Sequence, residues 1–476
     1  MPATSLRYDS TTNYGPVVMA VAMLALALGC GYVLAVGELT GLYVALSLIC
    51  VVAVLFDFRA GAVLLVLMLP MSASALFPHS MMGITGLNPL NLLLLATVGS
   101  YVLHGRLQRA GPLLDRPLAW LYIVPIAVAG VVGMRHVSEI PAVFYEIDAM
   151  TYSTARQYLL ATVVKPMVIV AIALMAGAAA ARSQKPERFI LPIALSVWLI
   201  GFIHIGFVIS QGPSLAILAS ADERGFYTPL GMHANDLGRL HLFAFALLLF
   251  VWAEAKRPGM RLFLLLTLGV LASALVLTFS RAAIAGAILV GALFVTWKFD
   301  AKTLSLVAIG AMLVVLLGAD VLYSRMMLGF DEGANAVTAG RIEGLWLPLL
   351  PEVLKSPLWG SGLDSIKWSY PMQIEALRPT SHPHNAYLQT LLDMGIIGLA
   401  LLLAYYVKVW KGFRALGSNA WLTPELRGLF QGATAALLAF FATGLVGSSL
   451  RPEAESAYLW LAIGLMYGVR GRRPAS

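Results

Sequence analysis

Residues 387–410 read YLQTLLDMGIIGLALLLAYYVKVW, a run in which Asp393 and Lys408 carry the charges. A helix of this length crosses the hydrocarbon core of a bilayer, which is about 30 Å thick. Lipid offers no partner to a bare backbone amide, so the run is expected to be helical. The whole chain shares this character: 59% of its 476 residues are hydrophobic and 12% are charged, where roughly 25% charged is typical of soluble domains. The sequence therefore predicts an all-α, polytopic transmembrane helix bundle.

Fourteen apolar runs are candidate membrane spans. Two pairs of runs are separated by minimal turns, 39–56 with 60–77 and 260–279 with 282–298, so the expected number is 12–14 spans, with 14 preferred. The runs fill the chain, and residues 1–476 are expected to form a single integral membrane domain. The candidate spans are 17–36, 39–56, 60–77, 88–104, 117–134, 161–181, 188–210, 236–255, 260–279, 282–298, 303–323, 387–410, 429–449 and 455–469.

If the chain crosses the membrane at each of these runs, every second turn lies on the same side. Most lysines and arginines fall in short turns that belong to one side. Basic turns stay in the cytoplasm, which predicts that both termini are cytoplasmic. The net charge of +8 is spread over these turns and does not indicate nucleic acid binding. The long polar segment 324–386 is then a loop on the opposite face, where ATP and nucleotide sugars are absent. Any energy-requiring reaction there needs a substrate that is already activated, and no nucleotide is expected.

The long loop ends in Ser381-His382-Pro383-His384-Asn385-Ala386-Tyr387. Imidazole is the side chain best suited to moving protons near neutral pH, so His384 is a candidate general base. Pro383 stiffens the turn that carries both histidines. The alternative is an interfacial histidine that caps the following helix. The neighbouring His382, Asn385 and the long loop favour the catalytic interpretation, with His382 and Asn385 as candidate substrate contacts.

Three arginines on the same predicted face, Arg224, Arg281 and Arg341, are candidates for binding an anionic group. The planar guanidinium fork matches phosphate oxygens and suits a pyrophosphate leaving group. The alternative is a set of surface arginines paired with nearby acids, since Arg224 follows Asp222 and Glu223 and Arg341 is near Glu343. We favour the binding role more for Arg224 and Arg281 than for Arg341. An unpaired charge at the position of Arg281 would be costly in a bilayer.

Weaker candidates lie before the run at 236, where His233 and Asn235 are expected to touch substrate unless Asn235 serves as the helix N-cap. His382 with His384 is a weak metal site because no carboxylate pattern accompanies it. We therefore predict no metal and no cofactor.

The distal half of the chain, roughly residues 224–400, resembles the O-antigen ligase and polymerase superfamily, and the earlier spans match it only in hydropathy. One departure is Asp393, where the family often has glutamate. The stretches that carry the resemblance are Arg224 to Asn235, Ser280-Arg281, Gly340-Arg341 with Trp346, Ser356-Pro357-Leu358-Trp359-Gly360-Ser361-Gly362, His384-Asn385-Ala386-Tyr387-Leu388 and Gly395-Ile396-Ile397-Gly398.

This resemblance implies a metal-independent, inverting glycosyl transfer with the helical architecture of membrane (GT-C-like) glycosyltransferases. It implies a donor glycan on undecaprenyl pyrophosphate, a lipid A–core acceptor, contacts with membrane lipids, and a location in the bacterial inner membrane with the site facing the periplasm. His384 would act as general base, Arg224 and Arg281 would bind the pyrophosphate, and Arg341 would be a further contact.

Other readings stay open on the sequence. An O-antigen or exopolysaccharide polymerase, or an enzyme that attaches the glycan to protein, would use the same donor. A non-enzymatic polysaccharide lipid transporter is a second alternative from a different class, although its charges would be expected within the spans. Sugar identity, glycan length, oligomeric state and the choice between His382 and His384 as base are not determined.

Overall fold

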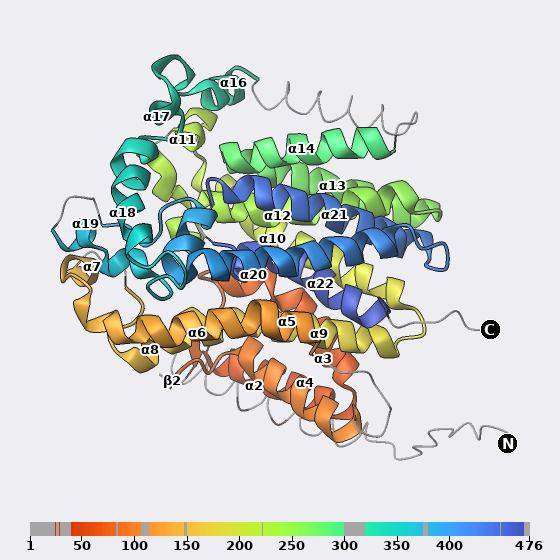
Figure 1. Ribbon diagram of the computed structural model, residues 1–476. Helices are drawn as coiled ribbons and strands as arrows, with labels where there is room; N and C mark the ends of the chain where they lie inside the picture. Colours follow the sequence, from red (N-terminus) through yellow and green to blue (C-terminus); the bar gives the residue numbers. More distant parts are fainter. Residues whose placement is uncertain are drawn as a thin grey trace. The chain divides into compact units, whose positions relative to one another are not determined.

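The computed structural model describes residues 24, 28, 40–81, 84–105, 114–146, 150–220, 222–298, 319–374, 379–447 and 449–470 (Figure 1). The regular secondary structure of these residues is helical apart from one short hairpin, in which β1 (Ser80–Met81) pairs antiparallel with β2 (Ile84–Thr85). The expected all-α class is confirmed. The described helices pack into two compact units, residues 1–65 with 77–110, and residues 66–76 with 111–476.

In the smaller unit, α2 (Thr40–Phe56) packs against α4 (Pro89–Gly105). The Ser100 hydroxyl donates to the carbonyl of Leu55 at 3.3 Å. The apolar run 60–77 yields a shorter helix than expected, because α3 (Phe58–Met68) ends just before Pro70. Proline disfavours helical geometry at the residue before it and removes a backbone donor.

The larger unit contains the seven described helices that are long and apolar enough to cross a membrane. They match seven of the predicted runs, with ends that differ by at most seven residues. Most of the runs 17–36 and 303–323 lies outside the described residues, so fourteen spans stays a prediction. The seven helices are Arg116–Glu139, Ala155–Arg182, Pro186–Gln211, Ala234–Glu254, Pro258–Leu277, Ala386–Gly417 and Pro424–Gly444.

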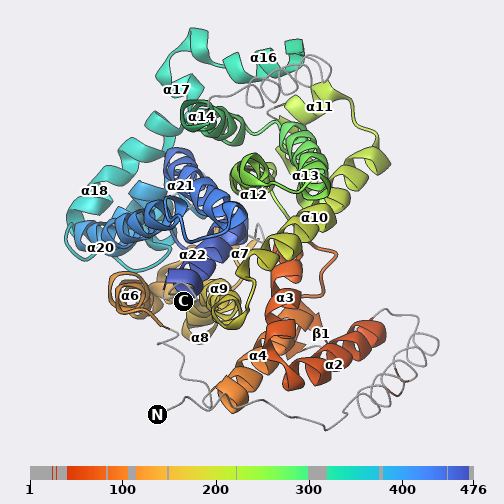
Figure 2. The same ribbon diagram turned by 90° about the vertical axis from the view of Figure 1, so that its right-hand side faces the viewer.

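Individual helices of the larger unit are labelled as in Figures 1 and 2. They are α5 (Arg116–Leu118), α6 (Val124–Gly133), α7 (Val143–Glu146), α8 (Ala155–Leu159), α9 (Lys165–Arg182), α10 (Ile190–Gln211), α11 (Leu215–Ala219), α12 (Ala234–Glu254), α13 (Pro258–Leu277), α14 (Arg281–Trp297), α16 (Ala319–Met327), α17 (Ala334–Val337), α18 (Leu347–Lys355), α19 (Tyr370–Gln373), α20 (Ala386–Gly417), α21 (Pro424–Gly444) and α22 (Ala457–Arg470).

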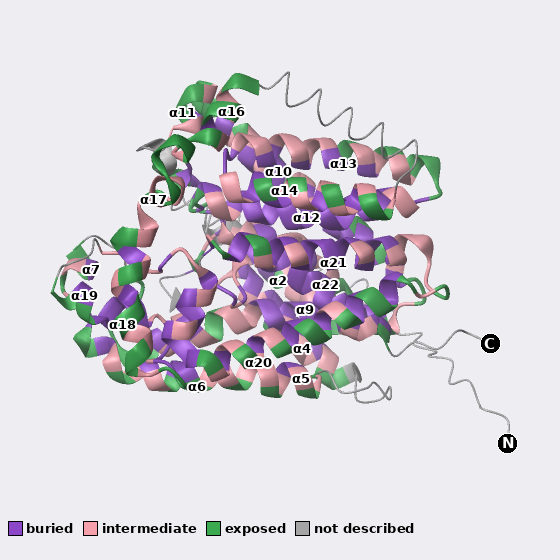
Figure 3. Ribbon diagram, turned by 45° about the horizontal axis from the view of Figure 1, so that its top comes forward, coloured by how far each residue is buried: buried purple, intermediate pink, exposed green. Residues whose placement is uncertain are grey.

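Helix α12 is the core of this unit and lies between α13, α14 and α21 (Figure 2). It is the most buried of the seven candidate spans, whereas most of α13 is accessible (Figure 3). Helices α9 and α22 approach each other at glycines, because a Cβ on Gly464 would overlap the backbone of Ala173. Apolar side chains such as Phe202 and Ile288 are exposed on the outer helices, as expected for surfaces that face lipid.

Helix α20 is interrupted at Gly395, whose φ of 64° and ψ of −170° are not helical. The break receives a segment that ends at Gly362: the amide of Ile396 donates to the carbonyl of Pro357 at 2.9 Å, and the amide of Gly362 donates to the carbonyl of Asp393 at 3.0 Å. A Cβ on Gly395 would overlap the backbone of Leu358. Residues 356–362 and 395–398, which are separate stretches of the sequence resemblance, thus form one structural element.

The segment 324–386 is not an extended loop in its described part. It forms the short helices α17, α18 and α19 together with the end of α16. It stays the longest polar segment between apolar helices, and its packing against α20 fixes the His382–His384 turn beside the start of α12.

Candidate functional site

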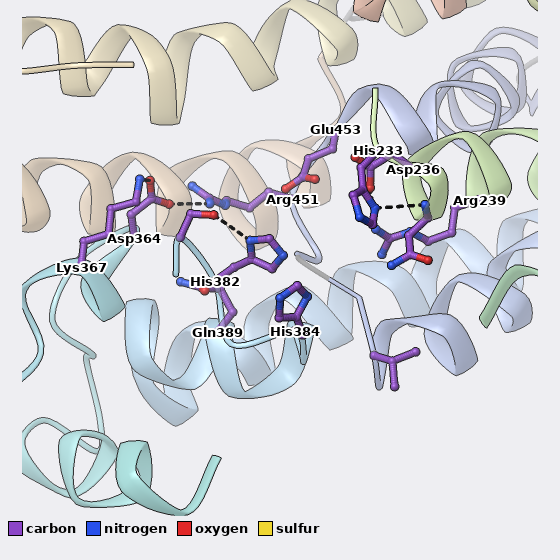
Figure 4. A pocket seen from close by; sticks show the side chains of 13 residues that line it. His233, Asp236, Arg239, Asp364, Lys367, His382, His384, Gln389, Arg451 and Glu453 are labelled. Carbon is purple, nitrogen blue, oxygen red and sulfur yellow. Dashed lines mark hydrogen bonds and ion pairs between the residues drawn. The ribbon is translucent and has the colours of Figure 1, made fainter. Parts of the chain in front are cut away.

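A cavity of about 380 Å³ lies where four segments meet: the start of α12, residues 364–367, residues 381–389 and residues 446–453. Figure 4 shows His382 and His384 in this cavity, between one group of charged residues around Asp364 and another around Arg239. Three carboxylates and three permanent cations line it: Asp236, Asp364, Glu453, Arg239, Lys367 and Arg451. The cavity is therefore strongly polar but nearly balanced in charge.

The turn that carries the two histidines is held rigidly. The Trp346 indole N–H donates to the carbonyl of Pro383 at 2.8 Å. His384 has a φ of 52°, a left-handed conformation that is uncommon for a residue other than glycine. The side chain of Asn385 accepts from the amides of Tyr387 and Leu388, both at 3.1 Å, and so caps α20. Backbone strain of this kind persists where the surrounding structure enforces it, and it clusters at functional sites.

The two imidazoles touch, with ring centroids 4.2 Å apart, and the Ser381 hydroxyl lies 2.9 Å from Nδ1 of His382. Burial lowers the pKa of His384 to about 3, with further lowering by His382 and Arg341. Burial also lowers the pKa of His382 to about 4. Both side chains are therefore neutral near pH 7, the state in which an imidazole nitrogen accepts a proton.

On one side of the histidines, Asp364 anchors a buried network. Its carboxylate accepts from Arg451 at 2.9 Å, from Lys367 at 3.0 Å and from the Tyr152 hydroxyl at 3.1 Å. Burial alone would raise the pKa of Asp364, but Lys367 and Arg451 bring it below its usual range. Asp364 is thus a carboxylate whose negative charge is fixed by two cations.

On the other side, Arg239 is buried in α12 and pairs with two acids. Its guanidinium lies 3.0 Å from Asp236 and 2.8 Å from Glu455. Gly447 leaves room for it, because a Cβ there would meet the Arg239 guanidinium. A buried charge of this kind is tolerated only when paired, which fixes the start of α12 against the segment that precedes α22.

A separate group of arginines adjoins the histidine turn without lining the cavity. Arg281 donates to the carbonyls of Leu328 and Val337, at 2.8 and 2.9 Å. Burial lowers the pKa of Arg325, and Arg281 lowers it further. Burial also lowers the pKa of Arg341, and Arg281 lowers it further.

Arg281 therefore acts on both Arg325 and Arg341, and Arg341 also acts on both histidines. No carboxylate among the described residues pairs with Arg281, Arg325 or Arg341. We call these three residues the arginine group. An uncompensated positive group of this kind favours an anionic ligand.

The structure brings together part of the predicted site. His233, His382 and His384 line the cavity with Asn235, whose side chain accepts from the Ser280 hydroxyl at 2.9 Å. His233 also caps α12 through its Nδ1, which accepts from the Asn235 amide at 3.1 Å, so the cap is the histidine and not the asparagine. Asn385 caps α20, while Arg281 and Arg341 belong to the arginine group. The side chain of Arg224 lies outside the described residues, although its backbone is in the 3₁₀-helix Asp222–Leu230.

The charged residues around the histidines and Arg325 were not among the candidates from the sequence. One of them, Arg239, lies inside the apolar run predicted at 236–255, and a charge at such a position was the available signal. The run 429–449 was predicted to be helical throughout, but α21 ends at Gly444 and the following residues turn back to the cavity, where Arg451 lies between this run and the one at 455–469. Among the described residues, no group of three or more His, Cys, Asp or Glu side chains is arranged to hold a metal ion.

Comparison with protein families matches residues 266–403 to a model described as O-antigen ligase. The match covers α14, the described part of 324–386 and the first half of α20, so it includes the arginine group and the histidine turn. The resemblance inferred from the sequence is confirmed over this segment. Comparison with curated proteins gives no significant match.

Proposed function

We propose that this chain, whose residues 266–403 match the O-antigen ligase family, is a membrane glycosyltransferase. It joins a glycan carried on undecaprenyl pyrophosphate to a sugar hydroxyl of lipid A–core at the periplasmic face of the inner membrane. One observation carries the proposal: His384 lies between a charge-balanced polar cavity and the arginine group. No carboxylate among the described residues forms an ion pair with the arginine group. The first environment suits a hydroxyl-rich sugar, and the second suits a pyrophosphate.

The arginine group provides the donor side. Guanidiniums form charge-assisted, two-pronged hydrogen bonds with phosphate oxygens. Positive charge fixed beside the leaving group stabilises the negative charge that develops when the glycosidic bond breaks. Arg281 is held by two backbone carbonyls, so it needs little reorganisation when the donor binds. Arg224 is proposed as a further donor contact.

The cavity provides the acceptor side. Each of its buried cations already has a carboxylate partner: Arg239 has Asp236, while Lys367 and Arg451 share Asp364. Such pairs leave little net charge but many donors and acceptors, which is the chemistry that a neutral sugar requires. The volume of about 380 Å³ lies within the range of small-molecule sites.

The proposed step requires a base between the two sides. The acceptor hydroxyl oxygen attacks the anomeric carbon of the donor sugar, and the bond from this carbon to the pyrophosphate oxygen breaks. His384 takes the hydroxyl proton, and undecaprenyl pyrophosphate leaves with the bonding electrons. Burial lowers the pKa of His384, and His382 and Arg341 lower it further. A bound pyrophosphate would offset Arg341 and raise that pKa, so donor binding makes His384 a stronger base.

The test is transfer by the purified protein in proteoliposomes that contain lipid-linked glycan donor and lipid A–core, without ATP or an ion gradient. The expected result is a new glycosidic bond and release of undecaprenyl pyrophosphate. Absence of any glycosidic product, with donor moved across the bilayer intact, would overturn the enzymatic proposal. It would support a transporter, for which the favouring observation is the buried ion pair of Arg239, in a candidate span, with Glu455.

A polymerase is the nearest alternative, because the family match is compatible with the same donor chemistry and a different acceptor. A deletion strain separates the two. Bare lipid A–core with long glycans retained on undecaprenyl pyrophosphate indicates a ligase, whereas core bearing one repeat indicates a polymerase. An unchanged lipopolysaccharide pattern with an underglycosylated protein would indicate a protein acceptor.

A further inference from the structure

A second polar cavity, of about 500 Å³, lies at the far end of α12 from the histidines. The helix begins beside His233 and ends at Glu254, and at 1.5 Å per residue its length is about 30 Å. The second cavity is therefore a separate site, one membrane thickness from the first. The ends of α12, α13 and α14 line it with Trp252, Glu254, Lys256, Arg261, Phe294 and Lys298.

The charges in this second cavity do not balance. Glu254 forms ion pairs with Lys298 and, at 3.5 Å, with Arg427. Its negative charge is thus shared by two cations. Among the described residues, no carboxylate pairs with Lys256 or Arg261. Among the described residues that line the cavity, positive charge is therefore in surplus, in contrast to the charge-balanced cavity at the other end of the helix.

An aromatic side chain positions one of these cations. The guanidinium of Arg261 lies over the Trp252 ring, 5.3 Å from its centroid. The Nε atom of Arg261 is buried, and no described residue accepts a hydrogen bond from it. A buried donor without a partner is unfavourable, and an anionic oxygen in the cavity would satisfy it. This orphaned donor points to a ligand rather than to a solvated surface charge.

The surface next to the cavity is apolar and accessible. Leu262 and Leu266 follow Arg261 on α13, and their exposed fractions are 59% and 54%. A ligand bound here would place its head group beside the cations and the rest of its length along the apolar surface of the helix. The structure therefore points to a binding site for an anionic phospholipid, whose phosphodiester contacts Arg261 and Lys256 and whose acyl chains lie along α13. A zwitterionic lipid fits less well because the surplus cations repel its ammonium group.

The test uses the full-length protein in a neutral detergent, with dioleoyl phosphatidylglycerol and dioleoyl phosphatidylcholine as probes. Native mass spectrometry counts bound lipids, and thermal unfolding reports stabilisation. The expected result is one phosphatidylglycerol bound to the wild-type protein. The double variant Lys256→Gln, Arg261→Gln should lose this lipid, because each removed charge lowers the affinity about fivefold. Lys408→Gln with Lys411→Gln is the matched control, because it removes two exposed cations of α20 and should leave the lipid bound.

Equal retention of the two lipids by the wild-type protein, or undiminished phosphatidylglycerol in the double variant, would overturn the site. Inorganic phosphate and glycerophosphoglycerol form a further arm. Binding of either with the affinity of the intact lipid would show a soluble phosphate ester as the ligand and overturn the lipid assignment. Should the double variant fail to fold, Lys256→Gln alone, at an exposed position, should weaken phosphatidylglycerol about fivefold. None of these outcomes bears on the glycosyl transfer reaction.

Discussion

Arg451 and Asp364 form an ion pair with 2.9 Å between guanidinium and carboxylate, although 87 positions separate them in the chain. Arg451 follows α21, and Asp364 lies in the segment before the histidine turn. The pair closes one side of the cavity and draws in Lys367 through the same carboxylate. This side of the site thus exists only because two distant segments pack together.

Asp364→Asn should destabilise the protein strongly. The substitution leaves Lys367 and Arg451 buried without their common counter-charge, and breaking a buried ion pair in this way costs about 3–5 kcal/mol. Thermal unfolding in detergent measures the loss. Asp331→Asn, at an exposed position, is the control and should change the unfolding temperature little. A well-folded Asp364→Asn protein with wild-type stability would show that the network contributes nothing.

His384→Gln should lower transfer by about 10²–10⁴-fold, the usual contribution of a general base, while the protein stays folded. His382→Gln is the matched variant, since it lies in the same turn and removes the imidazole that contacts His384. It should reduce transfer less. Radiolabelled glycan transfer in proteoliposomes compares the two. A larger loss in His382→Gln than in His384→Gln would reassign the base.

Arg341→Gln should weaken binding of the donor about tenfold, because a charge-assisted hydrogen bond is lost. The Michaelis constant for the lipid-linked donor should rise, whereas that for the acceptor should stay near the wild-type value. Arg135→Gln removes an exposed arginine and serves as control. An equal increase in both constants would place Arg341 outside the donor site.

Stability should fall as the pH drops below about 6.5. Burial holds the pKa of His384 at about 3 and that of His382 at about 4, while an unfolded chain binds these protons near pH 6.5. Between pH 6.5 and about pH 4 the unfolded state therefore binds more protons, and acid favours unfolding. Unfolding temperatures should drop less steeply in the double variant His382→Asn, His384→Asn. The same slope in both proteins would contradict the assignment, with His79→Asn, at an exposed position, as the control.

Gly395→Ala should disrupt the break in α20. Its backbone conformation is accessible essentially to glycine and costs other residues about 1–3 kcal/mol, and the added methyl group would overlap the backbone of Leu358. Gly344→Ala is the control, because nothing lies within 4 Å of its Cβ position. Yield and unfolding temperature report the effect, and equal behaviour of the two variants would show that the contact with Leu358 is dispensable.

Much of the helical fold was predictable from apolar runs, because the length of a run and the lack of hydrogen-bond partners in lipid dictate a helix. Helix ends were less predictable. The apolar residues after Gly444 predicted a span that continues to residue 449, but α21 stops at Gly444 and leaves Val446 to line the cavity. Hydropathy does not register where packing ends a helix.

The sequence by itself determined the all-α character, the polar segment 324–386, and a histidine turn placed at the start of an apolar helix, since these follow from local composition and spacing. Only the tertiary structure decided that His384 faces Arg239 and Arg451 across a cavity, that Arg325 joins Arg281, and that Asp364 is neutralised by two cations. Those relationships depend on the packing of elements far apart in the chain. Electrostatic pairing is fixed by distance in space, which the order of residues does not encode locally.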